Sequence, residues 1–235
     1  MACRIRGILF DKDGTLIDFR GQWLPAYRAA VAMLTEGDRA KAERLLRLAG
    51  YDPGSNHLDP ASPLACGTNR QIVEVWAAEL GIAATSELLG RVEAVFHEVA
   101  AANARPITDL EALFGRLRAR GIAVGVATMD SMVTARANLE ELGVADLVDF
   151  LVAADSGYGV KPAPGMVLAF CAECDLEPGA AATVGDSVVD LLMGRAAKAG
   201  LVVGVASGVT PRATLAPHAD IVLDTVAEIE EALEL

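Results

Sequence analysis

The chain has 235 residues, of which 53% are hydrophobic, and its formal net charge is −12. This length suits one large domain or a domain with a smaller insertion, and the apolar content excludes a disordered chain. The acidic balance argues against nucleic-acid binding, which needs a basic face, and an anionic substrate would require local cations or a metal ion.

The first predicted element is a buried strand, an apolar run over residues 5–10 that stops at the sequence DKDGT. Side chains two apart on a strand share one side, so we expect Asp11 and Asp13 to face one point and Lys12 to face away. Two carboxylates that face one point repel each other unless a cation lies between them. The pattern favours a paired-carboxylate site at the carboxyl end of a strand, although a turn with two solvated acids has the same sequence.

Residues 19–105 show helical periodicity and no convincing strand. Three prolines make residues 51–67 loop-like, and the Arg105-Pro106 pair marks a boundary. The predicted helices are one with Trp23, Tyr27, Ala30, Val31 and Leu34 on one face, one between Asp38 and Gly50, one from Thr68 to Leu80, and one from Thr85 or Ser86 to about Ala102.

From Ile107 onward, helices alternate with short apolar strands. Strands are predicted at 122–127, 150–154, 182–185, 201–206 and 221–223, and helices at about 108–120, 131–142, 165–174, 187–200 and 225–233. This alternation predicts an α/β fold with a doubly wound parallel sheet, a Rossmann-like core, and an inserted all-helical domain. We expect the core to contain residues 1–17 and 106–235, and the insertion residues 18–105.

Polar side chains follow several of these strands at the same edge of the sheet: Thr128, Lys161, Asp186 and, one helical turn later, Asp190. Together with Asp11 and Asp13, this set suits a phosphoryl group on Mg²⁺, which prefers carboxylate oxygens. Each residue also has an ordinary structural interpretation, as a turn former, a solvated loop lysine, a helix N-cap or an exposed helix acid. The occurrence of all of them in order at strand ends favours a phosphoryl site.

Four stretches resemble the motifs of the haloacid dehalogenase-like hydrolase superfamily: FDKDGTL (10–16), the strand ending in Thr128, KPAPG (161–165) and GDSVVDLLMGRAAKAG (185–200). The helical insertion resembles the cap of that family, so the resemblance covers nearly the whole chain. Within the superfamily the chain resembles the phosphoglycolate phosphatase-like group. The resemblance implies a Mg²⁺-dependent phosphatase of a small phosphorylated metabolite, phosphoglycolate-like or a sugar phosphate.

The resemblance also implies a role for each motif residue. Asp11 is the nucleophile that forms an aspartyl-phosphate, and Asp13 is the general acid and base. The phosphoryl oxygens are bound by Thr128, Lys161 and the backbone N–H groups at Gly14 and Met129. The Mg²⁺ ligands are Asp11, Asp186, Asp190 and the backbone carbonyl of Asp13.

Two positions depart from the usual family pattern. Lys12 replaces an apolar residue, and we expect little catalytic effect because it should point away from the site. Met129 stands where asparagine or serine is common. Because this position mainly supplies a backbone N–H, we expect the change to affect a substrate contact more than activity. The acid at Asp13 favours phosphate esters, because dehalogenases of this superfamily lack an acid there.

The cap is expected to close over the site and to supply selectivity. Its candidate specificity residues come from the proline-rich loop and the turn after it: Asn56, His57, Thr68, Asn69 and Arg70. Arg70 can pair with a second anionic group on the substrate. A surface arginine and an exposed loop histidine are the ordinary alternatives.

Two other functions fit the same motifs. A phosphomutase of this fold would return the phosphoryl group to substrate, and a phospho-accepting or binding module would keep it on Asp11. Cysteines without disulfide spacing, no room for a signal peptide and no membrane-length apolar run predict a cytoplasmic protein without a membrane partner. We expect a monomer or homodimer, although the sequence carries no signal for the oligomeric state.

Overall fold

The computed structural model describes residues 5–233, which divide into two compact units. The core unit contains the residues up to Phe19 and those from Arg105 onward, and the inserted unit spans Arg20–Ala104. The chain leaves and re-enters the core unit side by side, because Ile17 and Pro106 form an antiparallel bridge. The inserted unit is therefore a single insertion after the first strand.

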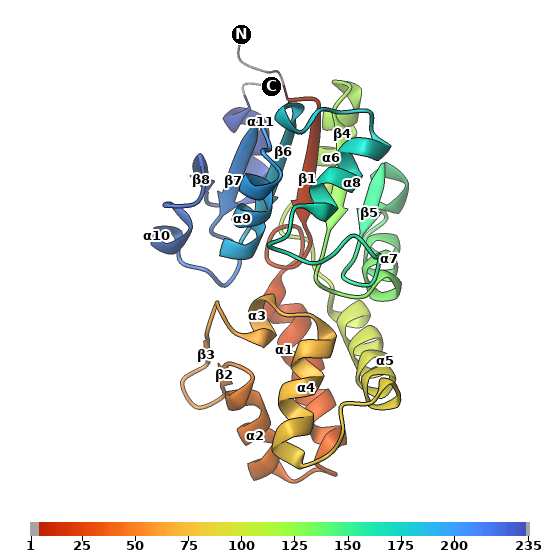
Figure 1. Cartoon of the computed structure of the whole chain (residues 1–235), viewed down its shortest axis with the longest axis vertical. Coiled ribbons are helices and arrows are strands. Elements are labelled where there is room, and N and C mark those ends of the chain that lie inside the picture. Colours follow the sequence, from red (N-terminus) through yellow and green to blue (C-terminus); the bar gives the residue numbers. More distant parts are fainter. Residues whose placement is uncertain (1–4, 234–235) are drawn as a thin grey trace. The chain divides into compact units, whose positions relative to one another are not determined.

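The core unit is built on one parallel sheet with the strand order β5-β4-β1-β6-β7-β8 (Figure 1). Its strands are β1 (Gly7–Asp11), β4 (Ala123–Ala127), β5 (Phe150–Val152), β6 (Ala181–Gly185), β7 (Leu201–Val205) and β8 (Ile221–Leu223). From β1 the order runs outward through β4 and β5 on one side and through β6 to β8 on the other. The order therefore reverses at β1, and open sheets of this kind bind ligands beyond the carboxyl ends of the strands at such a switch point.

Helices cover both faces of this sheet. Alternation along β1 directs Leu9 to one face and Phe10 to the other. Leu9 packs in an apolar cluster with residues of α8 (Gly165–Glu173) and α9 (Val188–Ala196), whereas the Phe10 ring lies 5.7 Å from the Phe114 ring of α6 (Leu110–Ala119). The remaining helices of this unit are α7 (Met132–Glu141), α10 (Arg212–Leu215) and α11 (Ile229–Ala232). The predicted doubly wound α/β fold is confirmed.

The inserted unit is mainly helical, with α1 (Phe19–Leu34), α2 (Arg39–Leu48), α3 (Pro63–Cys66), α4 (Asn69–Leu80) and α5 (Ser86–Asn103). Aromatic rings form its centre: the Phe96 ring lies 5.5 Å from both Trp23 and Tyr27 and 6.2 Å from Trp76. Asp38 caps α2 by accepting a hydrogen bond from the Lys41 N–H at 3.1 Å, as its sequence position predicts.

Several elements differ from the sequence prediction. Residues expected to form only a loop contain a hairpin of β2 (Tyr51–Asp52) and β3 (His57–Leu58), so the prediction of no strand in the insertion is wrong. The Asp52 carboxylate orders this turn by accepting from the Gly54 N–H and the Ser55 hydroxyl. The predicted helix at 225–233 is a 3₁₀ turn (Val226–Glu228) followed by α11. Across residues 5–233, every helix is too short or too polar to cross a membrane.

Candidate functional site

Three buried carboxylates lie together at the switch point of the sheet. Asp11 ends β1, Asp186 directly follows β6, and Asp190 lies in the first turn of α9. One oxygen from each lies within 4.8 Å of the others, and the three residues are 8%, 3% and 3% exposed. The fold thus places three hard oxygen ligands around a single point.

Lys161 supplies the positive charge beside this cluster. It lies in the loop between β5 and α8, is 4% exposed, and forms ion pairs with Asp11 and with Asp190, the latter at 2.6 Å from Nζ to Oδ1. Burial lowers the pKa of Lys161, but the charges of Asp11 and Asp190 outweigh it and hold the pKa above its ordinary value. Lys161 is therefore a permanent cation within the site.

One ammonium does not neutralise three carboxylates. Burial raises the pKa of Asp11 to about 7, assisted by the charges of Asp190 and Asp13 and opposed by Lys161. Burial and the charges of Asp11 and Asp190 raise the pKa of Asp186 well above its usual range. Three carboxylates and one ammonium leave a net charge of −2 when all are ionised, so the donor set fits a divalent cation.

Glycines around the cluster keep space for these carboxylates. A Cβ on Gly208 would lie 1.7 Å from Asp186 Oδ2, and one on Gly14 would lie 2.6 Å from the same oxygen. Gly14 also has a φ of 91°, a conformation that favours glycine. The Val209 N–H donates to Asp186 Oδ2 at 3.1 Å. The loop after β7 was not identified from the sequence, although β7 ends at the same edge of the sheet as β1 and β6.

The N-terminus of α9 fixes the direction of Asp190. Ser187 is the N-cap, and both its N–H and its hydroxyl donate to Asp190 Oδ2 while its Oγ accepts from the Asp190 N–H. The sequence left open whether Asp190 is an exposed helix acid and whether Asp186 is the N-cap. The structure shows a buried Asp190 and places the cap one residue after Asp186.

Asp13 lies beside the cluster and is held by two side chains. Lys12 Nζ donates to Asp13 Oδ1 at 2.7 Å, and the Thr128 hydroxyl donates to Asp13 Oδ2 at 3.3 Å. The expectation that Lys12 points clear of the site is therefore wrong. Its backbone position lies on the opposite side of the strand from Asp11, but its long side chain curls back, since Lys12 is 0% exposed and needs a carboxylate partner.

Two predicted backbone donors occupy different environments. The Gly14 N–H donates to the Ile17 carbonyl at 2.8 Å, which closes the turn after β1. Met129 follows Thr128 in the turn after β4 and is half-buried, and no described residue accepts a hydrogen bond from its N–H. The Met129 amide is thus the better placed of the two to bind an anion.

The predicted specificity residues lie at two places in the inserted unit. Thr68, Asn69 and Arg70 share the first turn of α4, where Thr68 forms a capping box with Gln71. Asn69 is buried, with its amide 3.4 Å from Glu93 Oε1, whereas Arg70 is exposed. His57 is exposed on β3.

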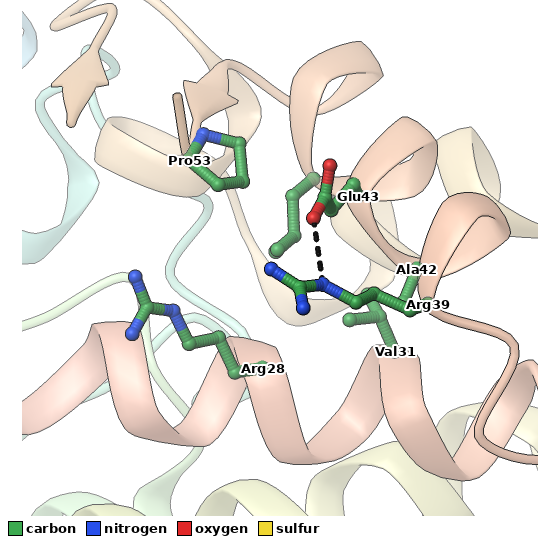
Figure 2. A pocket seen from close by; sticks show the side chains of 7 residues that line it. Arg28, Val31, Arg39, Ala42, Glu43 and Pro53 are labelled. Carbon is green, nitrogen blue, oxygen red and sulfur yellow. Dashed lines mark hydrogen bonds and ion pairs between the residues drawn. The ribbon is translucent and has the colours of Figure 1, made fainter. Parts of the chain in front are cut away.

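Figure 2 shows a separate pocket in the inserted unit, with a volume of about 340 Å³. Its two guanidinium groups have partners within the unit, because Arg28 donates to the Tyr51 hydroxyl at 2.8 Å and Arg39 donates to Glu43 at 3.1 Å. None of the candidate site residues identified from the sequence lines this pocket. We therefore place the functional site in the core unit.

Comparisons with known proteins find phosphatase relatives and solved structures of the same fold. Residues 5–198 match the model of the haloacid dehalogenase-like hydrolase family. The chain is 32% identical to the phosphoglycolate phosphatase of Rhodospirillum rubrum, over 84% of this chain and 78% of that one. It is 23% identical to the N-acetylmuramic acid 6-phosphate phosphatase of Pseudomonas aeruginosa, over 82% and 78%. A hydrolase from Pseudomonas syringae has the same fold, with a TM-score of 0.71 and 20% identity over 97% and 98% of the two chains.

The chain belongs to the haloacid dehalogenase-like hydrolase family. It is an enzyme of the phosphatase class, a phosphoric monoester hydrolase, and resembles the phosphoglycolate phosphatases within the family. The resemblance identified from the four sequence motifs is confirmed.

Proposed function

We propose that this enzyme is a Mg²⁺-dependent phosphatase of a small phosphorylated metabolite, phosphoglycolate-like or a sugar phosphate, and that it acts through an aspartyl-phosphate on Asp11. The observation that carries the proposal is the buried cluster of Asp11, Asp186 and Asp190 around Lys161 at the switch point of the sheet. Curated relatives with phosphatase names support the reaction class and the small phosphorylated substrate.

The carboxylates of Asp11, Asp186 and Asp190, with the backbone carbonyl of Asp13, would hold the Mg²⁺ ion. Bound there, the ion supplies charge neutralisation for the phosphoryl oxygens. The fit rests on the excess negative charge of the cluster and on the space that Gly14 and Gly208 leave around Asp186.

In the proposed reaction Asp11 attacks phosphorus and the bond to the leaving oxygen breaks. Asp13 donates a proton to that oxygen, and then takes a proton from the water that cleaves the aspartyl-phosphate. Lys161 and the backbone N–H of Met129 bind the phosphoryl oxygens, which positions them and offsets their charge. The Thr128 hydroxyl, which donates to Asp13 Oδ2 in this structure, turns to a phosphoryl oxygen when the substrate binds. Hydrolysis thus returns Asp11 unchanged and releases inorganic phosphate.

The inserted unit, within residues 18–105, is proposed to act as a cap domain that selects the substrate. The side chains that we propose for this selection are His57, Thr68, Asn69 and Arg70. We propose a cytoplasmic enzyme, a monomer or homodimer, that uses neither nucleic acid nor a membrane as a partner.

A panel of phosphate monoesters tests this function. It includes 2-phosphoglycolate, N-acetylmuramic acid 6-phosphate and several sugar phosphates, each assayed with Mg²⁺ and with EDTA. We expect Mg²⁺-dependent release of inorganic phosphate from at least one of them. Isomerisation of a sugar phosphate without phosphate release would identify a mutase instead, and a phosphoryl group that stays on Asp11 would identify a phospho-accepting module.

A further inference from the structure

Lys12 is a fully buried lysine that the proposed reaction does not use. It is 0% exposed, and its Nζ lies 2.7 Å from Asp13 Oδ1, 2.9 Å from Asn138 Oδ1 and 3.3 Å from Asp130 Oδ2. Lysine is almost never fully buried unless it is paired, because an ammonium is costly to remove from water. Two carboxylates and one amide oxygen therefore surround the Lys12 ammonium.

The contacts around Lys12 fix both oxygens of Asp13. Lys12 donates to Oδ1 and the Thr128 hydroxyl donates to Oδ2. The Thr128 oxygen accepts from the Asp130 N–H at 3.1 Å, so its hydroxyl proton is directed towards Asp13. Asp130 is itself buried, and its Oδ1 accepts from the Ser131 N–H at 2.7 Å.

We propose that Lys12 is a positioning residue for Asp13: its buried ammonium, held by Asp130 and Asn138, fixes the Asp13 carboxyl in the orientation needed for proton transfer to the leaving oxygen. This inference rests on the proposed function, in which Asp13 is the general acid. Because Asp13 lies beside the proposed Mg²⁺ site, its carboxylate could otherwise turn towards the ion. The 2.7 Å contact from Lys12 Nζ to Asp13 Oδ1 opposes that turn.

The inference predicts a dependence on the leaving group. An alkyl oxygen needs a proton as it departs, whereas p-nitrophenolate departs readily without one. We expect Lys12→Met, which keeps most of the aliphatic stem, to reduce kcat/KM for an alkyl phosphate at least about tenfold more than for p-nitrophenyl phosphate. Asp13→Asn should show the same pattern with a larger difference.

The alkyl phosphate is the best substrate of the monoester panel. The two substrates are compared at saturating Mg²⁺, and each variant is also titrated with Mg²⁺ from an EDTA baseline. Arg118→Met, which breaks the 2.6 Å ion pair with Asp149, is the matched control and should leave the ratio of the two substrates unchanged. Because Lys12→Met leaves Asp130 buried without this cation, the pair Lys12→Met with Asp130→Asn is measured in parallel. Thermal melting identifies the variants that fold.

Equal losses on both substrates in the folded Lys12 variants, with a large difference for Asp13→Asn, would overturn the inference and leave the proposed function intact. If Asp13→Asn loses kcat/KM equally on both substrates, Asp13 is not the general acid. Lys12 would then have no general acid to position. Wild-type protein without Mg²⁺-dependent turnover of any monoester would overturn the proposed function itself. A weaker Mg²⁺ affinity with an unchanged substrate ratio would assign Lys12 a purely structural role.

Discussion

The Asp186 carboxylate leaves no space for a side chain at Gly208, where a Cβ would lie 1.7 Å from Oδ2. Gly208→Ala must therefore displace Asp186 or shift the loop after β7. We expect a loss of about 1–3 kcal/mol in the free energy of unfolding and at least a tenfold loss in kcat/KM. Urea unfolding and Mg²⁺ titrations of activity measure both effects.

Gly115→Ala is the matched control for this substitution. Gly115 lies inside α6, and apart from its chain neighbours and the backbone of its own helix, no described atom lies within 4 Å of an added Cβ. Alanine should stabilise the helix by about 0.5–1 kcal/mol and leave activity unchanged. Wild-type Mg²⁺ affinity and activity in Gly208→Ala would contradict the tight approach to Asp186.

At the scale of single residues, the positions of strand ends in the sequence predicted which side chains lie together. The direction of a long side chain could not be predicted in this way. The rule that parallel strands end at one edge predicted that Asp11, Lys161, Asp186 and Asp190 lie together, and the structure brings them together. The direction of Lys12 was wrong because the alternation rule gives the direction of Cβ only. Four methylenes carry its ammonium back to Asp13. The catalytic roles of these residues stay predictions.

At the scale of elements, the N-cap of α9 stabilises the helix and also orients a side chain of the site. Ser187→Ala removes the hydroxyl that caps the helix and donates to Asp190. We expect a loss of about 1 kcal/mol in stability, as for other N-caps, together with lower activity and weaker Mg²⁺ binding. Denaturant unfolding and kinetic assays of the same preparation separate the two effects.

Asp109→Ala provides the comparison, since Asp109 caps α6 by accepting from the Ala112 N–H at 3.0 Å, and no hydrogen bond or ion pair in the described part of the chain joins it to a site residue. It should lose similar stability and keep its activity. Equal activities of the two variants at saturating Mg²⁺ would mean that Ser187 acts on stability alone.

Long periodic segments were predictable, and very short ones were not. The strand β8 matches its predicted range, and the large helices agree to within a few residues. The strands β2 and β3 have two residues each, and α10 has four, too few for a repeating pattern to appear. Side-chain bonds of Asp52 order the hairpin, and sequence periodicity carries no information about them.

At the scale of the whole molecule, the buried acids link stability to pH. The pKa of Asp11 is about 7 and that of Asp130 about 6, both raised above 3.8 mainly by burial. At a pH between the pKa of the unfolded state and the pKa of the folded state, the folded chain binds more protons than the unfolded chain. Stability of the metal-free protein therefore falls as pH rises from 3.8 towards 7.

We expect the melting temperature in EDTA to fall from about pH 5 to about pH 7.5, with a loss on the order of 2 kcal/mol in stability. Mg²⁺ should restore stability most at the higher pH, where its ligands are ionised. Asp11→Asn should flatten the pH profile and reduce the gain from Mg²⁺. A melting temperature that rises over this range in EDTA would contradict the raised pKa values.

The central claim is that Asp11 is the nucleophile of a Mg²⁺-dependent phosphatase. The most direct test is hydrolysis of p-nitrophenyl phosphate by wild-type protein and Asp11→Asn, each with Mg²⁺ and with EDTA. The proposed mechanism predicts turnover only by the wild type with Mg²⁺, and a loss of more than about 10³-fold in the variant. Turnover by Asp11→Asn at a rate near that of the wild type would contradict it.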